Sequence, residues 1–305
     1  MEDRRSEARL AGVELGGTNA IVVLGRGTEI VERKRFTVGA PHATLAAIEE
    51  QLRHWTEVEP IAALGIASFG PIELDPANPS YGQILLTPKP GWAGAGVLAQ
   101  LQEAIDCPAL VHTDVTAAAL AEGRFGAARG CSDFIYMTIG TGIGVGIITG
   151  GRPVIGRLHP EAGHMRVRRV DRDSFAGSCP IHMDCLEGLA AGPALAARAG
   201  KAGEWLTNDD SVWASVVDAL AEGCANLFLT LASERIVLGG GVANGRAWLA
   251  DAVGRSTAAK LGGYLPFVVD QAPVVMAALG ADAGPRGALL LAEQALAGEA
   301  VAKGV

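Results

Sequence analysis

The sequence predicts an α/β protein made of two related domains. Two observations support this class. Strand-like apolar runs alternate with helix-like runs along the 305 residues, as in α/β proteins. One pattern (strand, glycine-rich turn, strand, glycine turn, strand) also occurs twice. Residues 18–27 and 141–150 are corresponding parts of the two copies and have the same length. A repeat at this separation indicates two related domains rather than a solenoid, whose periods are about 20–50 residues.

The first domain is expected to span residues 1–115. Its helix over residues 44–55 is predicted by apolar residues at helical spacing, such as Leu45, Ile48 and Leu52. Residues 75–92 are rich in Pro, Gly and Asn, which is typical of a loop. The other expected elements are a helix over 97–105 and strands over 12–15, 20–24, 28–36, 61–67 and 109–113.

The second domain is expected to span residues 116–285. The expected strands cover 134–139, 145–148, 153–155, 235–238 and 273–279, and the expected helices cover 116–128, 190–199, 211–232 and 247–259. A final helix, over about residues 286–298, is expected to pack back onto the first domain.

Composition limits the classes of function. The net charge is −8, with 25 Lys and Arg against 33 Asp and Glu, so no nucleic-acid partner is expected. Apolar stretches are broken well short of the roughly 18 residues that a membrane span needs, and the charged start lacks a signal peptide's apolar core. We therefore expect a cytoplasmic protein without a membrane partner. A basic cluster, Arg166, Arg168, Arg169 and Arg172, is predicted to be a solvated edge.

Three glycine-rich turns follow apolar strands: Gly16-Gly17-Thr18, Gly140-Thr141-Gly142 and Gly239-Gly240-Gly241. Glycine lets a backbone approach a ligand closely, and successive N–H groups in such turns bind anions. One such turn is more often a hairpin, but three of them favour nucleotide phosphates. The chain contains neither a P-loop motif nor the dinucleotide fingerprint.

Cysteine and histidine spacing predicts a metal site. The five cysteines form an odd set, which argues against a disulfide framework. Cys179, His182 and Cys185 stand three residues apart, and His164 lies upstream. Two thiolates and two imidazoles are a common zinc set, and four protein ligands leave no open position, so a structural zinc is expected. The alternative is two buried cysteines near an unrelated histidine. We expect His159 not to be a ligand.

Asp114 follows the predicted strand over 109–113 and precedes the next helix. A carboxylate at the carboxyl end of a strand lies where α/β proteins bind ligands, and phosphoryl transfer to an alcohol needs a carboxylate to accept the proton. Aspartate is also a favoured helix N-cap. The residues alone leave both roles open.

Together these motifs resemble the actin-like ATPase superfamily, which includes hexokinases, and within it the fructokinases of the ROK family of sugar kinases. The resemblance extends from about Gly12 to about Ala297. Its specific segments are Glu14 to Thr18, Ser68 to Pro71, Tyr81-Gly82, Thr87 to Trp92, Thr113 to Val115, Ile139 to Gly144, His159 to His164, Cys179 to Gly188 and Leu238 to Val242. The Thr-Pro-Lys-x-Gly-Trp segment and the Cys-Pro-x-His form of the metal loop favour fructokinase over glucokinase.

The resemblance implies two actin-like (ribonuclease H-like) domains with a cleft between them, and a metal loop over residues 164–187. It implies an ATP-dependent hexose kinase, with fructose the expected substrate, Asp114 the catalytic base, Mg²⁺ accompanying ATP, and a homodimer. The implied sugar ligands are Gly70, Pro71, Thr113, Glu161, His164 and Glu187. The implied nucleotide-binding residues are Gly16, Gly17, Thr18, Asn19, Gly140, Thr141, Gly142, Gly192, Pro193, Gly239, Gly240 and Gly241.

Two residues depart from the usual sequence of the family, which has lysine at the position of Asn19 and asparagine at that of Thr116. Three alternatives stay open: a kinase for mannose, glucose or N-acetylmannosamine, a catalytically inert sugar sensor, and a transcriptional regulator. Against the regulator, only about eleven residues precede the first strand, too few for a helix-turn-helix domain.

Overall fold

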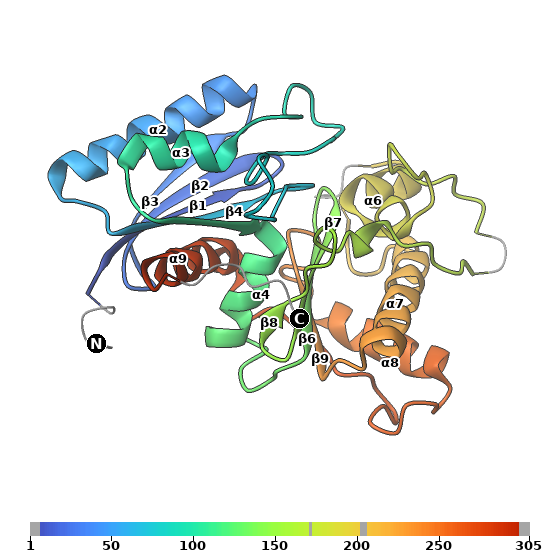
Figure 1. Cartoon of the computed structure of the whole chain (residues 1–305). Coiled ribbons are helices and arrows are strands. Elements are labelled where there is room, and N and C mark those ends of the chain that lie inside the picture. The colour runs from blue at the N-terminus through green and yellow to red at the C-terminus, as the bar shows by residue number, and fades with distance from the viewer. Residues whose placement is uncertain (1–6, 171–172, 202–205, 299–305) are drawn as a thin grey trace. The chain divides into compact units, whose positions relative to one another are not determined.

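The computed structural model describes residues 7–170, 173–201 and 206–298, and these form two compact units. The first contains the chain up to Ala121, Val154–Pro160, and the chain from Ala281 onward; the second contains Glu122–Pro153 and Glu161–Gly280. Figure 1 labels many of the elements of both units.

The first unit is built on a mixed five-stranded sheet with the order β3-β2-β1-β4-β5. Strands β1, β2 and β3 are successive antiparallel neighbours, whereas β1, β4 and β5 run parallel. The bounds are β1 Arg9–Leu15, β2 Asn19–Arg26, β3 Glu29–Thr37, β4 Ala63–Ser68 and β5 Ala109–Thr113. Every residue of β4 is buried, as expected for a strand covered on both faces.

Helices cover both faces of this sheet (Figure 1). Helices α2 (Pro41–Val58) and α3 (Val97–Ile105) bury their apolar stripes against one face, where they share a core with Val13 and Ile66. Helix α9 (Ala283–Leu296), preceded by the turn η3 (Gly280–Asp282), packs on the other face. The approach is close, because a Cβ on Gly65 of β4 would lie 1.8 Å from the carbonyl oxygen of Ala288.

The second unit repeats the topology of the first. Its sheet has the order β10-β9-β6-β7-β8. Strands β6, β7 and β8 are successive antiparallel neighbours, and β6, β9 and β10 run parallel. The bounds are β6 Phe134–Ile139, β7 Ile143–Thr149, β8 Arg152–Pro153, β9 Arg235–Gly239 and β10 Val274–Met276. This correspondence confirms the duplicated α/β unit that the sequence predicted.

The remaining helices are α4 (Asp114–Phe125), η1 (Ala162–His164), α5 (Leu186–Ala190), α6 (Gly192–Ala199), α7 (Val212–Leu231) and α8 (Trp248–Leu261). The single helix predicted over 190–199 is wrong in detail. The backbone is extended at Ala191, and α6 restarts with Pro193 in its first turn, where proline is well tolerated. By length and composition α7 could span a membrane, but 56% of its apolar window is buried inside the protein.

Candidate functional site

In the first unit, three parallel strands end in the same row of the sheet. Leu15 of β1 is paired with Ser68 of β4, and Ser68 is paired with Thr113 of β5. The residues that follow this row are therefore neighbours at the carboxyl edge of the sheet, where α/β proteins bind ligands. They are Gly16, Gly17, Thr18 and Asn19 after β1, Gly70 and Pro71 shortly after β4, and Asp114 after β5.

Asp114 is the first residue of α4, but Thr113 caps this helix. The hydroxyl of Thr113 accepts a hydrogen bond from the backbone N–H of Thr116 at 3.2 Å and donates one to the hydroxyl of Thr116 at 2.7 Å. This i to i+3 pattern is typical of an N-cap. The Asp114 carboxylate accepts a hydrogen bond from the neighbouring Val115 N–H at 2.8 Å. It is thus not needed as the cap that the sequence left open.

Burial raises the pKa of Asp114 to about 7, and the nearby backbone N–H groups oppose that rise. Desolvation penalises the charged form of a carboxyl. A carboxyl that titrates near neutral pH can accept a proton in a reaction and release it afterwards. The environment of Asp114 therefore fits a general base.

Glu14 is a second carboxyl at this edge, one for which the sequence predicted no role. Burial raises the pKa of Glu14 to about 7, and the charge of Asp114 adds to the rise. The carboxyl packs against the start of α9, since a Cβ on Gly284 would lie 2.1 Å from Oε1 of Glu14. The signal in the sequence was an acid in an otherwise apolar strand, two residues before Gly16.

His159 lies in the first unit rather than beside the cysteines. Its Nε2 accepts a hydrogen bond at 3.1 Å from the backbone N–H of Ile72, next to the cis Gly70-Pro71 bond. Burial lowers the pKa of His159 below its usual value, so this histidine serves as a neutral acceptor that holds the segment after β4.

In the second unit, three predicted nucleotide-binding segments meet at the ends of β6 and β9. The N–H of Gly192 donates to the carbonyl of Gly140 at 2.8 Å, and the N–H of Val242 donates to that of Ile139 at 2.9 Å. Gly240 has φ +87°, and a Cβ there would lie 2.5 Å from the Ile139 carbonyl oxygen. Glycine is therefore required where these turns approach each other. The remaining members, Thr141, Gly142, Pro193, Gly239 and Gly241, belong to the same three segments.

The four predicted metal ligands, His164, Cys179, His182 and Cys185, converge, and their donor atoms all lie within 4.8 Å of one another. His164 Nδ1 lies 3.7 Å from Cys179 Sγ and 3.6 Å from Cys185 Sγ, and His182 Nδ1 lies 4.0 Å from Cys179 Sγ. Zinc bonds of about 2.3 Å to sulfur and about 2.1 Å to nitrogen, at tetrahedral angles, place such atoms roughly 3.6 Å apart. The donor set therefore fits a tetrahedral ion.

Glu187 joins this cluster to the glycine turn after β6. Its Oε2 accepts a hydrogen bond from the Ile143 N–H at 3.0 Å, and its Oε1 lies 4.0 Å from His164 Nδ1. Glu187 lies in the first turn of α5, which begins directly after Cys185. Glu161, at the start of η1, is exposed. The acids predicted to contact sugar in this unit are thus both close in sequence to metal-loop residues.

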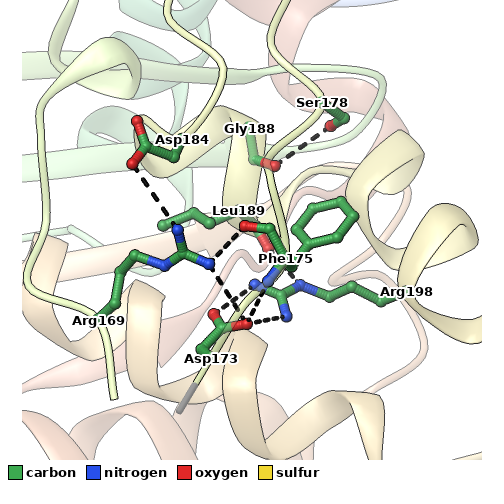
Figure 2. A network of polar contacts seen from close by, with 8 residues as sticks. All are labelled: Arg169, Asp173, Phe175, Ser178, Asp184, Gly188, Leu189 and Arg198. Atoms are coloured by element: carbon green, nitrogen blue, oxygen red, sulfur yellow. Dashed lines mark hydrogen bonds and ion pairs between the residues drawn. The ribbon is translucent and has the colours of Figure 1, made fainter. Parts of the chain in front are cut away.

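Ion pairs hold the loop that carries the cysteines (Figure 2). Arg198 forms a two-pronged contact with Asp173, at 3.0 and 2.9 Å, and its guanidinium lies 4.3 Å from the centre of the Phe175 ring. Arg198 holds the pKa of Asp173 down at about 2. Arg169 lies between Asp173, at 3.4 Å, and Asp184, at 3.8 Å.

The sequence predicted a solvated edge for the basic cluster of Arg166, Arg168, Arg169 and Arg172. Arg168 is exposed, as expected, whereas Arg169 is partly buried in this network, and Arg166 also pairs with Asp184. Arg172 lies outside the described residues. Asp184 stands between His182 and Cys185, so these arginines fix the segment that carries two predicted ligands.

The chain is similar to known proteins over nearly its whole length. The profile of the ROK family matches residues 10–295. A fructokinase of Pediococcus pentosaceus is 41% identical over 290 residues, which is 94% of this chain and 98% of that protein. A fructokinase of Zymomonas mobilis is 37% identical, covering 92% of this chain and 95% of that protein.

Among solved structures, a ROK hexokinase from Thermus thermophilus aligns with a TM-score of 0.75 and 27% identity, covering 93% of this chain and 97% of that one. This likeness confirms the actin-like fold class that the sequence predicted.

Proposed function

Because the chain belongs to the ROK family, we propose that it is an ATP-dependent fructokinase, which transfers the γ-phosphoryl group of ATP to the 6-hydroxyl of fructose. The observation that carries this proposal is Asp114, a carboxyl with a pKa of about 7 beside the aligned ends of β1, β4 and β5. The similarity to fructokinases supports fructose over other hexoses.

Asp114 would accept the proton of the attacking hydroxyl, which increases the nucleophilicity of that oxygen as it reaches the phosphorus. Gly70, Pro71 and Thr113 would contact the sugar from the first unit, and Glu161, His164 and Glu187 from the second. Carboxylate and imidazole acceptors suit sugar hydroxyls, because a wrong sugar leaves them unpaired.

The glycine turns would hold the nucleotide. Backbone N–H groups of Gly16, Gly17 and Thr18, with the Asn19 amide, would bind phosphate oxygens, as would those of Gly140, Thr141 and Gly142. Gly192, Pro193, Gly239, Gly240 and Gly241 would line the position of the adenosine. Mg²⁺ bound with ATP supplies neutralisation of phosphate charge. The side chain of Glu14, whose pKa is raised by burial, lies beside the first glycine turn. Its carboxylate would hold the Mg²⁺ ion.

We also propose that His164, Cys179, His182 and Cys185 hold one structural zinc ion. With four protein ligands the site is closed. Its effect would be to fix the backbone directly before Glu187 and to set the ring orientation of His164. We further propose a cytoplasmic homodimer; gel filtration coupled to light scattering tests its oligomeric state.

The substrate can be tested with the purified protein, Mg-ATP and a panel of fructose, mannose, glucose and N-acetylmannosamine, each product being identified by ³¹P NMR. Fructose 6-phosphate as the preferred product supports the proposal. Preference for another hexose would keep the chemistry and replace the substrate. Nucleotide and sugar binding without any phosphorylated product would favour an inert sugar sensor.

A further inference from the structure

The glycine turn after β1 has a lysine beside it that comes from a distant part of the sequence. The side-chain nitrogen of Lys89 donates a hydrogen bond to the carbonyl oxygen of Gly17. The same nitrogen lies 5.5 Å from the centre of the Phe69 ring. Lys89 belongs to the long segment between β4 and α3, so 72 residues separate it from Gly17.

The segment that carries Lys89 is firmly anchored. Trp92 is fully buried, its indole N–H donates to the carbonyl of Gly39 at 3.0 Å, and its ring meets that of Phe69 edge-on at 5.1 Å. The backbone N–H of Trp92 donates in turn to the Lys89 carbonyl at 3.3 Å. This anchoring limits the conformational freedom that Lys89 would lose on meeting a ligand.

The ammonium of Lys89 has no acidic partner within the described part of the chain. Partial burial lowers its pKa, with no carboxylate to oppose that shift. A partly desolvated cation without a counter-ion is costly, and Nζ has two further N–H donors besides the one that Gly17 accepts. The Lys89 ammonium is therefore available to bind an anion.

The turn itself offers further donors to an anion. Gly16 N–H donates within the turn to Asn19 at 3.0 Å, whereas the N–H groups of the exposed Gly17 and Thr18 have no acceptor among the described residues. The side chains of the turn supply no positive charge, since Asn19 is neutral. Lys89 is the cation that the structure brings to this position.

We propose that Lys89 binds the terminal phosphate of the nucleoside triphosphate at the Gly17–Thr18 turn and stabilises the charge that develops there during transfer. This inference rests on the proposed kinase activity. It assigns Lys89 to the nucleotide rather than to the sugar, and it gives the Thr-Pro-Lys segment a chemical role. The side chain would keep its bond to Gly17 and use its remaining donors on the phosphate.

The test compares Lys89→Met and Lys89→Arg with the wild type. The matched control is Lys34→Met, which removes a half-exposed lysine on β3 of the same unit whose partner is Glu32. Binding of a non-hydrolysable ATP analogue and of ADP is measured by calorimetry. The KM values for ATP and fructose, kcat, and Tm are measured alongside.

A charge-assisted hydrogen bond of ordinary strength predicts that Lys89→Met weakens analogue binding about 10- to 100-fold, with a much smaller loss for ADP and an unchanged KM for fructose. Lys89→Arg should retain most of the analogue affinity, and Lys34→Met should behave as wild type. Equal analogue affinity in Lys89→Met and wild type, or a defect confined to the KM for fructose, would overturn the proposal. If the wild type binds the analogue but phosphorylates no sugar, the proposed function fails, and the titrations still decide the role of Lys89.

Discussion

The carboxyl groups of Glu14 and Asp114 lie near enough that the charge of Asp114 raises the pKa of Glu14, in addition to the effect of burial. Glu14 is the penultimate residue of β1, and Asp114 directly follows β5. Two acids that both titrate near pH 7 at one sheet edge are costly to ionise together. A bound cation would offset the repulsion between the two carboxylates. The pair of acids is therefore consistent with a role in phosphoryl transfer with Mg²⁺.

The raised pKa of Asp114 predicts loss of activity in mild acid. A base must be deprotonated, so kcat/KM for fructose should fall about tenfold per pH unit below about pH 7. The measurement is a pH–rate profile at saturating Mg-ATP, with enzyme stability checked at each pH. A profile that stays flat down to pH 5.5 would show that Asp114 is not the base, or that its pKa is normal.

Asp114→Asn should not destabilise the protein at neutral pH. The folded protein holds the Asp114 proton up to about pH 7, whereas the unfolded chain releases it near the ordinary value of 3.8. The folded state therefore binds more protons between these values, and stability falls as pH rises through this range. Asparagine does not titrate, so the variant does not lose this stability as pH rises. The difference in Tm between variant and wild type should therefore increase from pH 5 to pH 8, by about 2–4 °C for each kcal/mol of unfolding free energy that the wild type loses. A variant that is less stable at pH 8 than at pH 5, relative to wild type, would contradict this reasoning.

Loss of a metal ligand should remove the ion and loosen the loop. Metal analysis of the wild type is expected to find one zinc ion per chain. Cys185→Ser should abolish this zinc, lower Tm, and reduce activity by about 10- to 100-fold. Cys131→Ser is the control, because Cys131 lies outside the cluster and is only partly buried. A wild-type protein purified without chelator that contains no zinc would refute the metal assignment.

Gly65→Ala should weaken the packing of α9 on the first sheet. The added Cβ would lie 1.8 Å from the Ala288 carbonyl oxygen, and such overpacking costs about 1–3 kcal/mol. Gly39→Ala is the control, because a Cβ there meets nothing within 4 Å. Urea unfolding of both variants measures the difference. Equal free energies of unfolding would mean that α9 shifts without cost.

The features that the sequence predicted best are those that depend on short, local sequence motifs. The glycine turns, the Cys179 to Cys185 spacing and the repeated strand–turn–strand unit each lie within a short stretch of chain. Their residue types are limited by backbone conformation or ligand chemistry. The structure accordingly brings the donor atoms of the four predicted metal ligands together and repeats the same sheet order in both units.

The features that sequence did not predict depend on long-range contacts. The alignment of Leu15 with Ser68 and Thr113 is a matter of strand register. The contact of Lys89 with Gly17 depends on how Trp92 anchors a loop without regular structure. The break at Ala191 that divides the helix predicted over residues 190–199 comes where Gly192 donates its N–H to Gly140, 52 residues away.

The most direct test of the account is the initial rate of ADP release from Mg-ATP, with and without fructose, by wild-type protein and by Asp114→Asn. The account predicts strong fructose-dependent release by wild type. The variant should lose at least about 100-fold in kcat while still binding the ATP analogue and fructose with near wild-type affinity. Fructose-dependent release by Asp114→Asn at the wild-type rate would contradict the assignment of the base, and no sugar-dependent release by wild type would contradict the kinase itself.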